Sequence, residues 1–274
     1  MLFNVLIPFD FSAQSIEVTK NIIRLIPSIH SKVYIVYVNE KNEVYTEKDI
    51  YNKLEVFKEG SGVQVAVLKG KTSEAVLNYA DEINASVICI SNTSDPKKRY
   101  DYLGSVAKEL IEKSNRPVIM LKSEVNPEAV KTILLPIDLT EDNKLKISTA
   151  VFFCKLFSPT MIKLVSVVLN TDDYGLNKLA LRLHRLTGFI ERAGVECVGE
   201  IIRYYEEEPE QVNIGKSLIE YADQSAAEVV LVMSGEKDDH TENTLNKESQ
   251  YMLSSIRNNV ISITPFLRSL QYMN

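Results

Sequence analysis

A glycine-serine pair at the start of an expected helix is the first feature of this sequence with recognisable chemistry. Gly104 ends a long polar loop, and Ser105 begins the helical pattern of residues 105–114. The first N–H groups of a helix lack partners and lie at the positive end of its dipole, so an anion is stabilised there. The pair predicts either a phosphate site or an ordinary helix cap. The basic run Lys97 to Arg99 either adds charge to that site or is solvated.

A carboxylate, Asp10, comes directly after the first apolar run, residues 5–8. Ligands of open α/β sheets bind beyond the carboxyl ends of the strands. Asp10 can therefore accept a hydrogen bond from a ribose hydroxyl or hold a metal ion. The alternative is an Asx turn or helix N-cap with Ser12. Because Asp138 stands at the equivalent place later in the chain, we favour a shared structural role for the two carboxylates.

The remaining reactive residue types do not form a catalytic or metal-binding pattern. Three cysteines, Cys89, Cys154 and Cys197, form no CxxC pair and lie among apolar neighbours, as expected for reduced thiols packed in a core. The histidines are scattered, with none at ligand spacing. The motifs GxSxG, HExxH and GxxxxGK[ST] are absent. We therefore expect no metal and no enzyme, although weak ATP hydrolysis stays open.

Composition bounds the class of protein. The 274 residues carry a net charge of −6, which argues against a broad nucleic-acid-binding surface. The first residues lack the basic region and cleavage site of a signal peptide. No stretch approaches the roughly 20 apolar residues that span a membrane. These features predict a cytoplasmic protein without a membrane partner.

The elements that must position Asp10 and Gly104 occur twice, because the chain repeats itself. Four segments return in the same order: 4–12 as 132–140, 33–40 as 162–170, 77–91 as 219–234, and 115–121 as 257–263. Within each unit, apolar runs of strand length alternate with segments of helical periodicity. In the first unit the expected strands are 5–8, 33–38, 63–68, 87–90 and 118–121.

This alternation predicts two tandem doubly wound α/β domains, each a five-stranded parallel sheet flanked by helices. The predicted domains are residues 1–124 and 129–274, joined by a linker at 122–130. An acidic stretch at 204–211 is expected to be an exposed loop.

The chain resembles the universal stress protein family in its tandem two-domain form, with the adenine nucleotide alpha hydrolase-like fold. The resemblance lies in the Pro-x-Asp after the first strand and in Gly104-Ser105-Val106, which opens a helix before a strand that begins Pro-Val. Nucleotide-binding members carry G-x2-G-x9-G-[S/T] after strand four. Here the spacing is kept as Ser91, Ser94, Gly104 and Ser105, with serines at the first two glycine positions.

The resemblance implies binding of ATP or another adenine nucleotide in the first unit. It places Asp10 near the ribose and Val38 at the adenine. It places further residues around the phosphates or beside them: Pro8, Ile90, Ser91, Ser94, Gly104, Ser105 and Val106. Since serine limits the approach of the backbone to phosphate, weaker or altered ligand binding is also open.

The second unit departs further from the family pattern. Asn246 and Lys247 replace the Gly-Ser pair, so we expect this cleft to have lost phosphate binding and the unit to serve as a structural partner. In the family, domains pair through their fifth strands. Strands 118–121 and 260–263 are therefore expected to pair within the chain as an internal pseudo-dimer, and a homodimer of whole chains is a further possibility.

Two functions follow as hypotheses. In the first, this is a cytosolic stress-response protein regulated by a nucleotide in its first domain. In the second, it is a nucleotide-independent interaction or scaffold protein in which both clefts are vestigial. A phosphoryl- or nucleotidyl-transfer enzyme on the same scaffold is disfavoured by the missing motifs.

Overall fold

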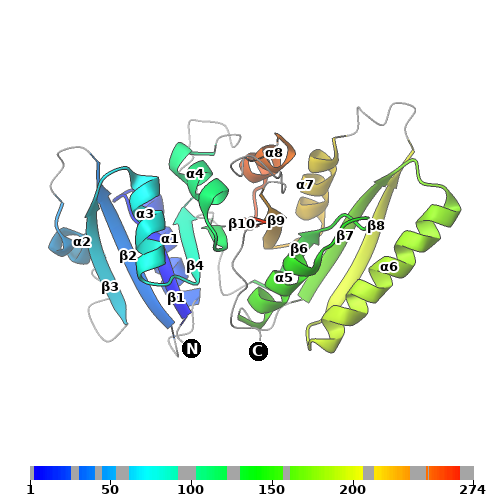
Figure 1. The fold of residues 1–274 in the computed structure, drawn as a ribbon, viewed down its shortest axis with the longest axis horizontal. Coiled ribbons are helices and arrows are strands. Elements are labelled where there is room, and N and C mark those ends of the chain that lie inside the picture. The colour runs from blue at the N-terminus through cyan, green and yellow to red at the C-terminus, as the bar shows by residue number, and fades with distance from the viewer. Residues whose placement is uncertain are drawn as a thin grey trace.

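One continuous sheet organises the described part of the chain. The computed structural model describes residues 3–25, 31–40, 45–53, 62–91, 103–121, 130–156, 161–205, 213–234, 245 and 247–265. Their strands form a ten-stranded sheet in the order β3-β2-β1-β4-β5-β10-β9-β6-β7-β8. In Figure 1 the first half of the chain, blue to cyan, lies on one side of the molecule and the second half lies on the other.

The first half of the sheet contains β1 to β5, and all its neighbouring strands are parallel. Its elements are β1 (Phe3–Pro8), α1 (Ala13–Leu25), β2 (Ser31–Asn39), α2 (Glu47–Lys53), β3 (Val63–Lys69), α3 (Thr72–Glu82), β4 (Val87–Ser91), α4 (Ser105–Lys113) and β5 (Val118–Leu121). The five predicted strands are thus confirmed. The C-terminal part of the predicted second helix, toward Gly60, lies outside the described residues.

The second half repeats the order, again with parallel neighbours. Its elements are β6 (Thr132–Pro136), α5 (Lys144–Leu156), β7 (Met161–Leu169), α6 (Asp173–Arg192), β8 (Cys197–Tyr204), α7 (Ile214–Gln224), β9 (Val229–Met233), α8 (Lys247–Ser255) and β10 (Asn259–Ile263). The predicted loop at 204–211 needs one correction. Tyr204 ends β8, because it continues the parallel ladder opposite Leu169.

The two halves join through their fifth strands, β5 and β10, which run antiparallel. Val260 lies opposite Met120, Ile261 opposite Ile119, and Ser262 opposite Val118. This confirms the pairing expected from the sequence. Side chains reinforce the junction: Thr264 Oγ1 donates to the Ser114 carbonyl at 2.9 Å, and Ser234 Oγ donates to the Ile111 carbonyl at 3.3 Å. The predicted domain boundary, 124–129, lies outside the described residues.

Helices cover both faces of the sheet, so strand residues that point to either face are mostly apolar. Successive strand residues point to opposite faces, so Val87 and Cys89 of β4 join one hydrophobic cluster while Ile88 and Ile90 join the other. Helices α1, α2, α5 and α6 pack on the first cluster, and α3, α4, α7 and α8 pack on the second. This explains the unbroken apolar runs of the inner strands.

Caps begin several of these helices. Ser12 Oγ accepts from the Ser15 N–H at 3.0 Å ahead of α1, as its residue type predicts. Asp172 accepts from the Gly175 N–H at 2.7 Å ahead of α6, and Asn213 accepts from the Lys216 N–H at 2.9 Å ahead of α7. Each satisfies an N–H group that the first turn leaves without a partner.

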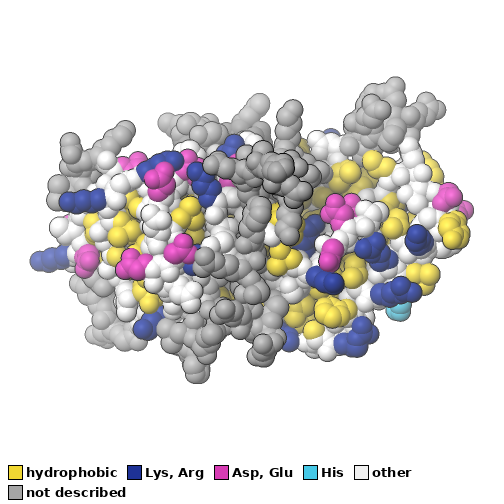
Figure 2. Space-filling view, viewed as in Figure 1, with side chains coloured by type: hydrophobic (Ala, Val, Ile, Leu, Met, Phe, Trp, Pro, Cys, Tyr) yellow, Lys and Arg dark blue, Asp and Glu magenta, His cyan; other side chains and the backbone are white. Residues whose placement is uncertain are grey.

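The described surface mixes charges of both signs. Figure 2 shows Lys and Arg side chains interspersed with Asp and Glu over the face in view, with no broad area of one sign. None of the described helices is long and apolar enough to cross a membrane.

Candidate ligand clefts

The first cleft opens at the point where the strand order reverses. Strand β1 has β2 on one side and β4 on the other, and a cavity of about 450 Å³ lies beyond the carboxyl ends of these three strands. Such a switch point is where open α/β sheets bind ligands. Its wall is completed by Thr72 of α3 and by Val106, Ala107 and Leu110 of α4.

Six of the nine residues predicted for the nucleotide site line this cavity. They are Pro8, Asp10, Val38, Ile90, Ser91 and Val106. Ser94 lies outside the described residues. Gly104 and Ser105 precede Val106 on α4 but are not part of the cavity wall, so the structure does not bring them together with the other six. Their contact with a ligand stays a prediction.

The start of α4 corrects one expectation. Gly104 is the N-cap, which offers no side chain to cap the helix, and Ser105 is its first residue. The Ser105 hydroxyl therefore does not act as the cap. Gly104 has φ −58° and ψ 148°, angles open to any residue. The glycine is therefore not required by its backbone conformation.

Asp10 and Asp138 share the structural role that we favoured. Asp10 Oδ1 accepts from the Ser12 N–H at 3.0 Å. Asp138 Oδ1 accepts from the Thr140 N–H at 2.7 Å and from the Thr140 hydroxyl at 2.6 Å. Both are Asx turns after an equivalent strand. Asp10 is exposed and lines the cavity, so this role does not exclude a contact with a ligand.

Two polar residues of the first cleft were missed from the sequence. Glu40 follows β2, and its Oε1 accepts from the Thr72 N–H at 2.6 Å, at the start of α3. Both residues line the cavity. Glu40 stands after its strand much as Asp10 does after β1, and that position was the available signal. The carboxylate gives this wall of the cleft a negative charge.

A third carboxylate, that of Glu109, lies nearby on α4. Glu109 forms an ion pair with Lys71 at 2.9 Å and accepts a short hydrogen bond from the Ser73 hydroxyl. The hydrogen bonds from Lys71 and Ser73 hold the pKa of Glu109 below its usual range. These contacts join the start of α3 to α4, the two helices that wall the cleft.

Aromatic rings border the first cleft and were also missed. Phe11 contacts Tyr45 with ring centroids 4.4 Å apart, and it contacts Phe9 and Tyr37 at 5.0 and 5.1 Å. Phe9 and Tyr37 line the cavity. Phe11 has φ +61°, which a bulky residue adopts only when its surroundings impose it. Nothing in residue order signals this conformation.

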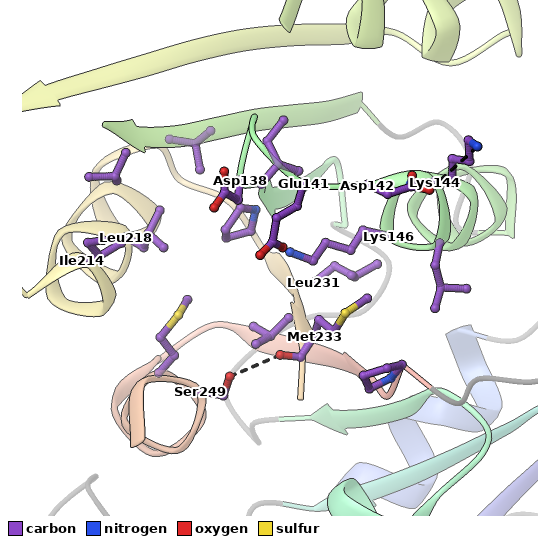
Figure 3. A pocket seen from close by; sticks show the side chains of 18 residues that line it. Asp138, Glu141, Asp142, Lys144, Lys146, Ile214, Leu218, Leu231, Met233 and Ser249 are labelled. Carbon is purple, nitrogen blue, oxygen red and sulfur yellow. Dashed lines mark hydrogen bonds and ion pairs between the residues drawn. The ribbon is translucent and has the colours of Figure 1, made fainter. Parts of the chain in front are cut away.

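The second cleft occupies the equivalent place in the other half. Its volume is about 800 Å³, and it lies beyond β6, β7 and β9. Figure 3 shows Asp138, Glu141 and Lys146 above an apolar floor that includes Leu231 and Met233. Asn246 and Lys247, the residues predicted to replace the Gly-Ser pair, lie partly outside the described residues. Residue 246 is not described, nor is the side chain of Lys247. Among the described residues, no group of three or more His, Cys, Asp or Glu side chains is placed to hold a metal ion.

Comparison with known proteins gives a family for part of the chain. Residues 45–122 match the model of the Universal stress protein family. The matched segment lies within the first half of the chain. The match runs from the segment before α2 to just after β5 and includes the loop between β4 and α4. No curated protein matches the chain.

Three solved structures of similar length share the fold of this chain. A universal stress protein from Archaeoglobus fulgidus DSM 4304 has a TM-score of 0.73 at 15% identity, over 95% of this chain and 98% of its own. A putative universal stress protein from Pseudomonas aeruginosa UCBPP-PA14 has 0.72 at 13%, over 97% and 94%. A functionally unknown protein from Pseudomonas aeruginosa PAO1 has 0.70 at 13%, over 97% and 93%. At these identities the likeness establishes the fold.

Proposed function

We propose that this protein acts in the stress response and that its first half binds ATP or another adenine nucleotide as a regulatory ligand. The observation that carries the proposal is the cavity at the strand-order switch point, lined by six residues of the expected nucleotide site. Its volume of about 450 Å³ lies within the range of small-molecule sites.

Apolar and polar groups are distributed in this cleft as an adenine nucleotide requires. Val38 and Ile90 are buried and offer an apolar floor, while Val106 stands 37% exposed at the helix start. Asp10 projects from the turn after β1. A phosphate that extends past Val106 to the start of α4 would be stabilised by the helix dipole. The base and the ribose would meet the apolar floor and Asp10.

The rival function is nucleotide-independent interaction, and one observation favours it. Glu40 lines the cleft and its carboxylate is bonded to the start of α3, so the second helix N-terminus at this site is already occupied by an anion. With serine also at position 91, the cleft is less cationic and less open than a glycine-rich phosphate loop. In this case both clefts are vestigial and the paired halves carry the function.

Calorimetric titration with ATP, ADP and AMP separates the two functions. We expect binding by the wild type in the micromolar-to-millimolar range. The variant Gly104→Asp should bind at least about tenfold more weakly, because a carboxylate at the start of α4 competes with phosphate for the same N–H groups; tenfold corresponds to about 1.4 kcal/mol.

The matched control is Asn213→Asp, which places the same added charge at the N-cap of α7 in the other half. It should bind nucleotide as the wild type does. Absence of binding at millimolar nucleotide, or equal affinity in Gly104→Asp, would reject nucleotide regulation and leave the interaction protein.

A further inference from the structure

The second cleft carries a cation, Lys146, whereas none of the described residues that line the first cleft is a lysine or an arginine. The helices that follow the two turns align by their first hydrogen bonds: the Ile16 N–H donates to the Ser12 carbonyl, and the Ile147 N–H donates to the Asn143 carbonyl. The third residue of α1 is therefore Ser15, and the third residue of α5 is Lys146. Ser15 is 2% exposed and its hydroxyl accepts from the Asp10 N–H at 3.3 Å, whereas Lys146 lines the cavity.

Lys146 is half-buried and lies near two carboxylates. Burial lowers the pKa of its ammonium group, and the carboxylates of Glu141 and Asp138 oppose that shift. Figure 3 shows the Glu141 and Lys146 side chains pointing toward one another over Leu231. Opposite charges therefore stand side by side at one wall of the cavity.

Apart from Ser249 and the charged side chains, the described residues that line the cavity are apolar. Val165 and Leu231 are fully buried at the floor, and Leu218 of α7 is nearly so. Ile214, Met233 and Met252 extend this surface. An apolar body placed here loses contact with water, while its polar head can meet Lys146 and Glu141.

Charge argues against a polyphosphate in this cleft. Three carboxylates, those of Asp138, Glu141 and Asp142, line the cavity against the two ammonium groups of Lys144 and Lys146. One Asp142 oxygen already accepts from the Lys144 N–H at 2.9 Å, at the start of α5. A ligand with several negative charges would face net repulsion, whereas a ligand with one charge of each sign would not.

We propose that the second cleft binds a small zwitterion with an apolar body, the class to which the free apolar α-amino acids belong. The ligand carboxylate pairs with Lys146, and its ammonium group pairs with Glu141 beside Asp138. The apolar side chain lies on Ile214 and Met233, which are half-buried and line the cavity. This site is separate from the first cleft and does not depend on nucleotide binding there.

The test is calorimetric titration of the full-length protein with L-phenylalanine and L-leucine. Two single-charge analogues, 3-phenylpropionate and 2-phenylethylamine, keep the aromatic body and remove one head group each. We expect the amino acids to bind, and each analogue to bind at least about tenfold more weakly, as the loss of one charge-assisted hydrogen bond predicts.

Two variants connect that binding to the cleft. Lys146→Met and Glu141→Gln should each weaken L-phenylalanine binding by about tenfold or more. Lys155→Met removes the same charge from an exposed position in the last turn of α5 and should leave binding unchanged. Glu141 is exposed, so Glu141→Gln is tolerated by the fold and decides the matter even if Lys146→Met fails to fold.

Each other outcome overturns the proposal. Absence of binding at millimolar amino acid removes the site. Equal binding of 3-phenylpropionate makes it a site for organic acids, and displacement of L-phenylalanine by ATP makes it a nucleotide site. Because these titrations report on Lys146 and Glu141, their failure is distinguishable from failure of nucleotide binding in the first cleft.

Discussion

Single residues show where sequence reasoning about this chain works and where it stops. The Asx turn at Asp10 was predictable, because an acidic residue two positions before a hydroxyl residue has few other local partners. Lys146 was not, because a lysine within a helical pattern is ordinarily solvated. The two helices begin at different distances from Asp10 and Asp138, so residue order alone does not pair Lys146 with its counterpart, the buried Ser15.

The cysteines give a prediction at this scale. All three are free and buried. Burial raises the pKa of the Cys89 thiol far above its usual range, and it raises the pKa of Cys197 to about 12. Since the thiolate is the reactive form, we expect none of the three to react with a thiol reagent at pH 8 in the native protein, and all three to react in denaturant.

The same shifts set the alkaline stability. Above the ordinary cysteine pKa, about 8.5, an unfolded chain loses thiol protons that the folded chain keeps, so the folded state binds more protons. The free energy of unfolding must then fall as pH rises from 8.5 toward 11. Denaturant titrations at several pH values measure this, and a flat or rising profile would contradict the burial of these thiols.

At the scale of elements, α6 against β8 shows how local packing decides the effect of a substitution. A Cβ built on Gly199 of β8 would lie 2.8 Å from Leu183 Cγ of α6, too close for a real contact. Leu183 is 7% exposed and has little room to move. Gly188, in the middle of α6, is different: its nearest neighbour would be Arg192 at 3.5 Å, an ordinary contact.

We therefore expect the same glycine-to-alanine change to act in opposite directions. Gly199→Ala should lower the free energy of unfolding by about 1–3 kcal/mol through overpacking. Gly188→Ala should raise it by about 0.5–1 kcal/mol, since alanine favours a helix interior. Urea denaturation with an unchanged m value measures both. Shortening the neighbour, in Gly199→Ala with Leu183→Ala, should make the two changes less than additive.

Elements were also what the sequence predicted best. The inner strands were found because strands buried on both faces form unbroken apolar runs, as in Val87 to Ile90. Side-chain contacts between different elements could not be predicted from the sequence. The bond from Glu40 to Thr72 and the positive φ of Phe11 depend on how β2, α3 and the β1 turn meet in space. The order of residues along the chain does not directly specify such contacts.

At the scale of the whole molecule, the continuous sheet depends on the antiparallel pair of β5 and β10. A strand edge left open invites pairing with another chain. Residues 1–124 produced alone would expose β5, whose residues Val118, Ile119 and Met120 are buried in the intact protein.

We expect this fragment to form a dimer through β5, measured by light scattering coupled to size-exclusion chromatography. Ile119→Lys in the same fragment is the control, because a charge on an edge strand opposes edge-to-edge pairing, and it should shift the fragment toward the monomer. A folded, monomeric fragment with wild-type β5 would show that the first half does not need a partner strand.

The β5–β10 pair also has a consequence for what the two clefts are free to become. In a dimer of identical chains, two-fold symmetry makes every substitution appear in both copies, so the two sites must stay alike. Here one chain supplies both partners in a fixed one-to-one stoichiometry. Mutation can then change Ser15 without changing Lys146. Joining the copies removes the symmetry constraint, so the two clefts are free to acquire different ligands.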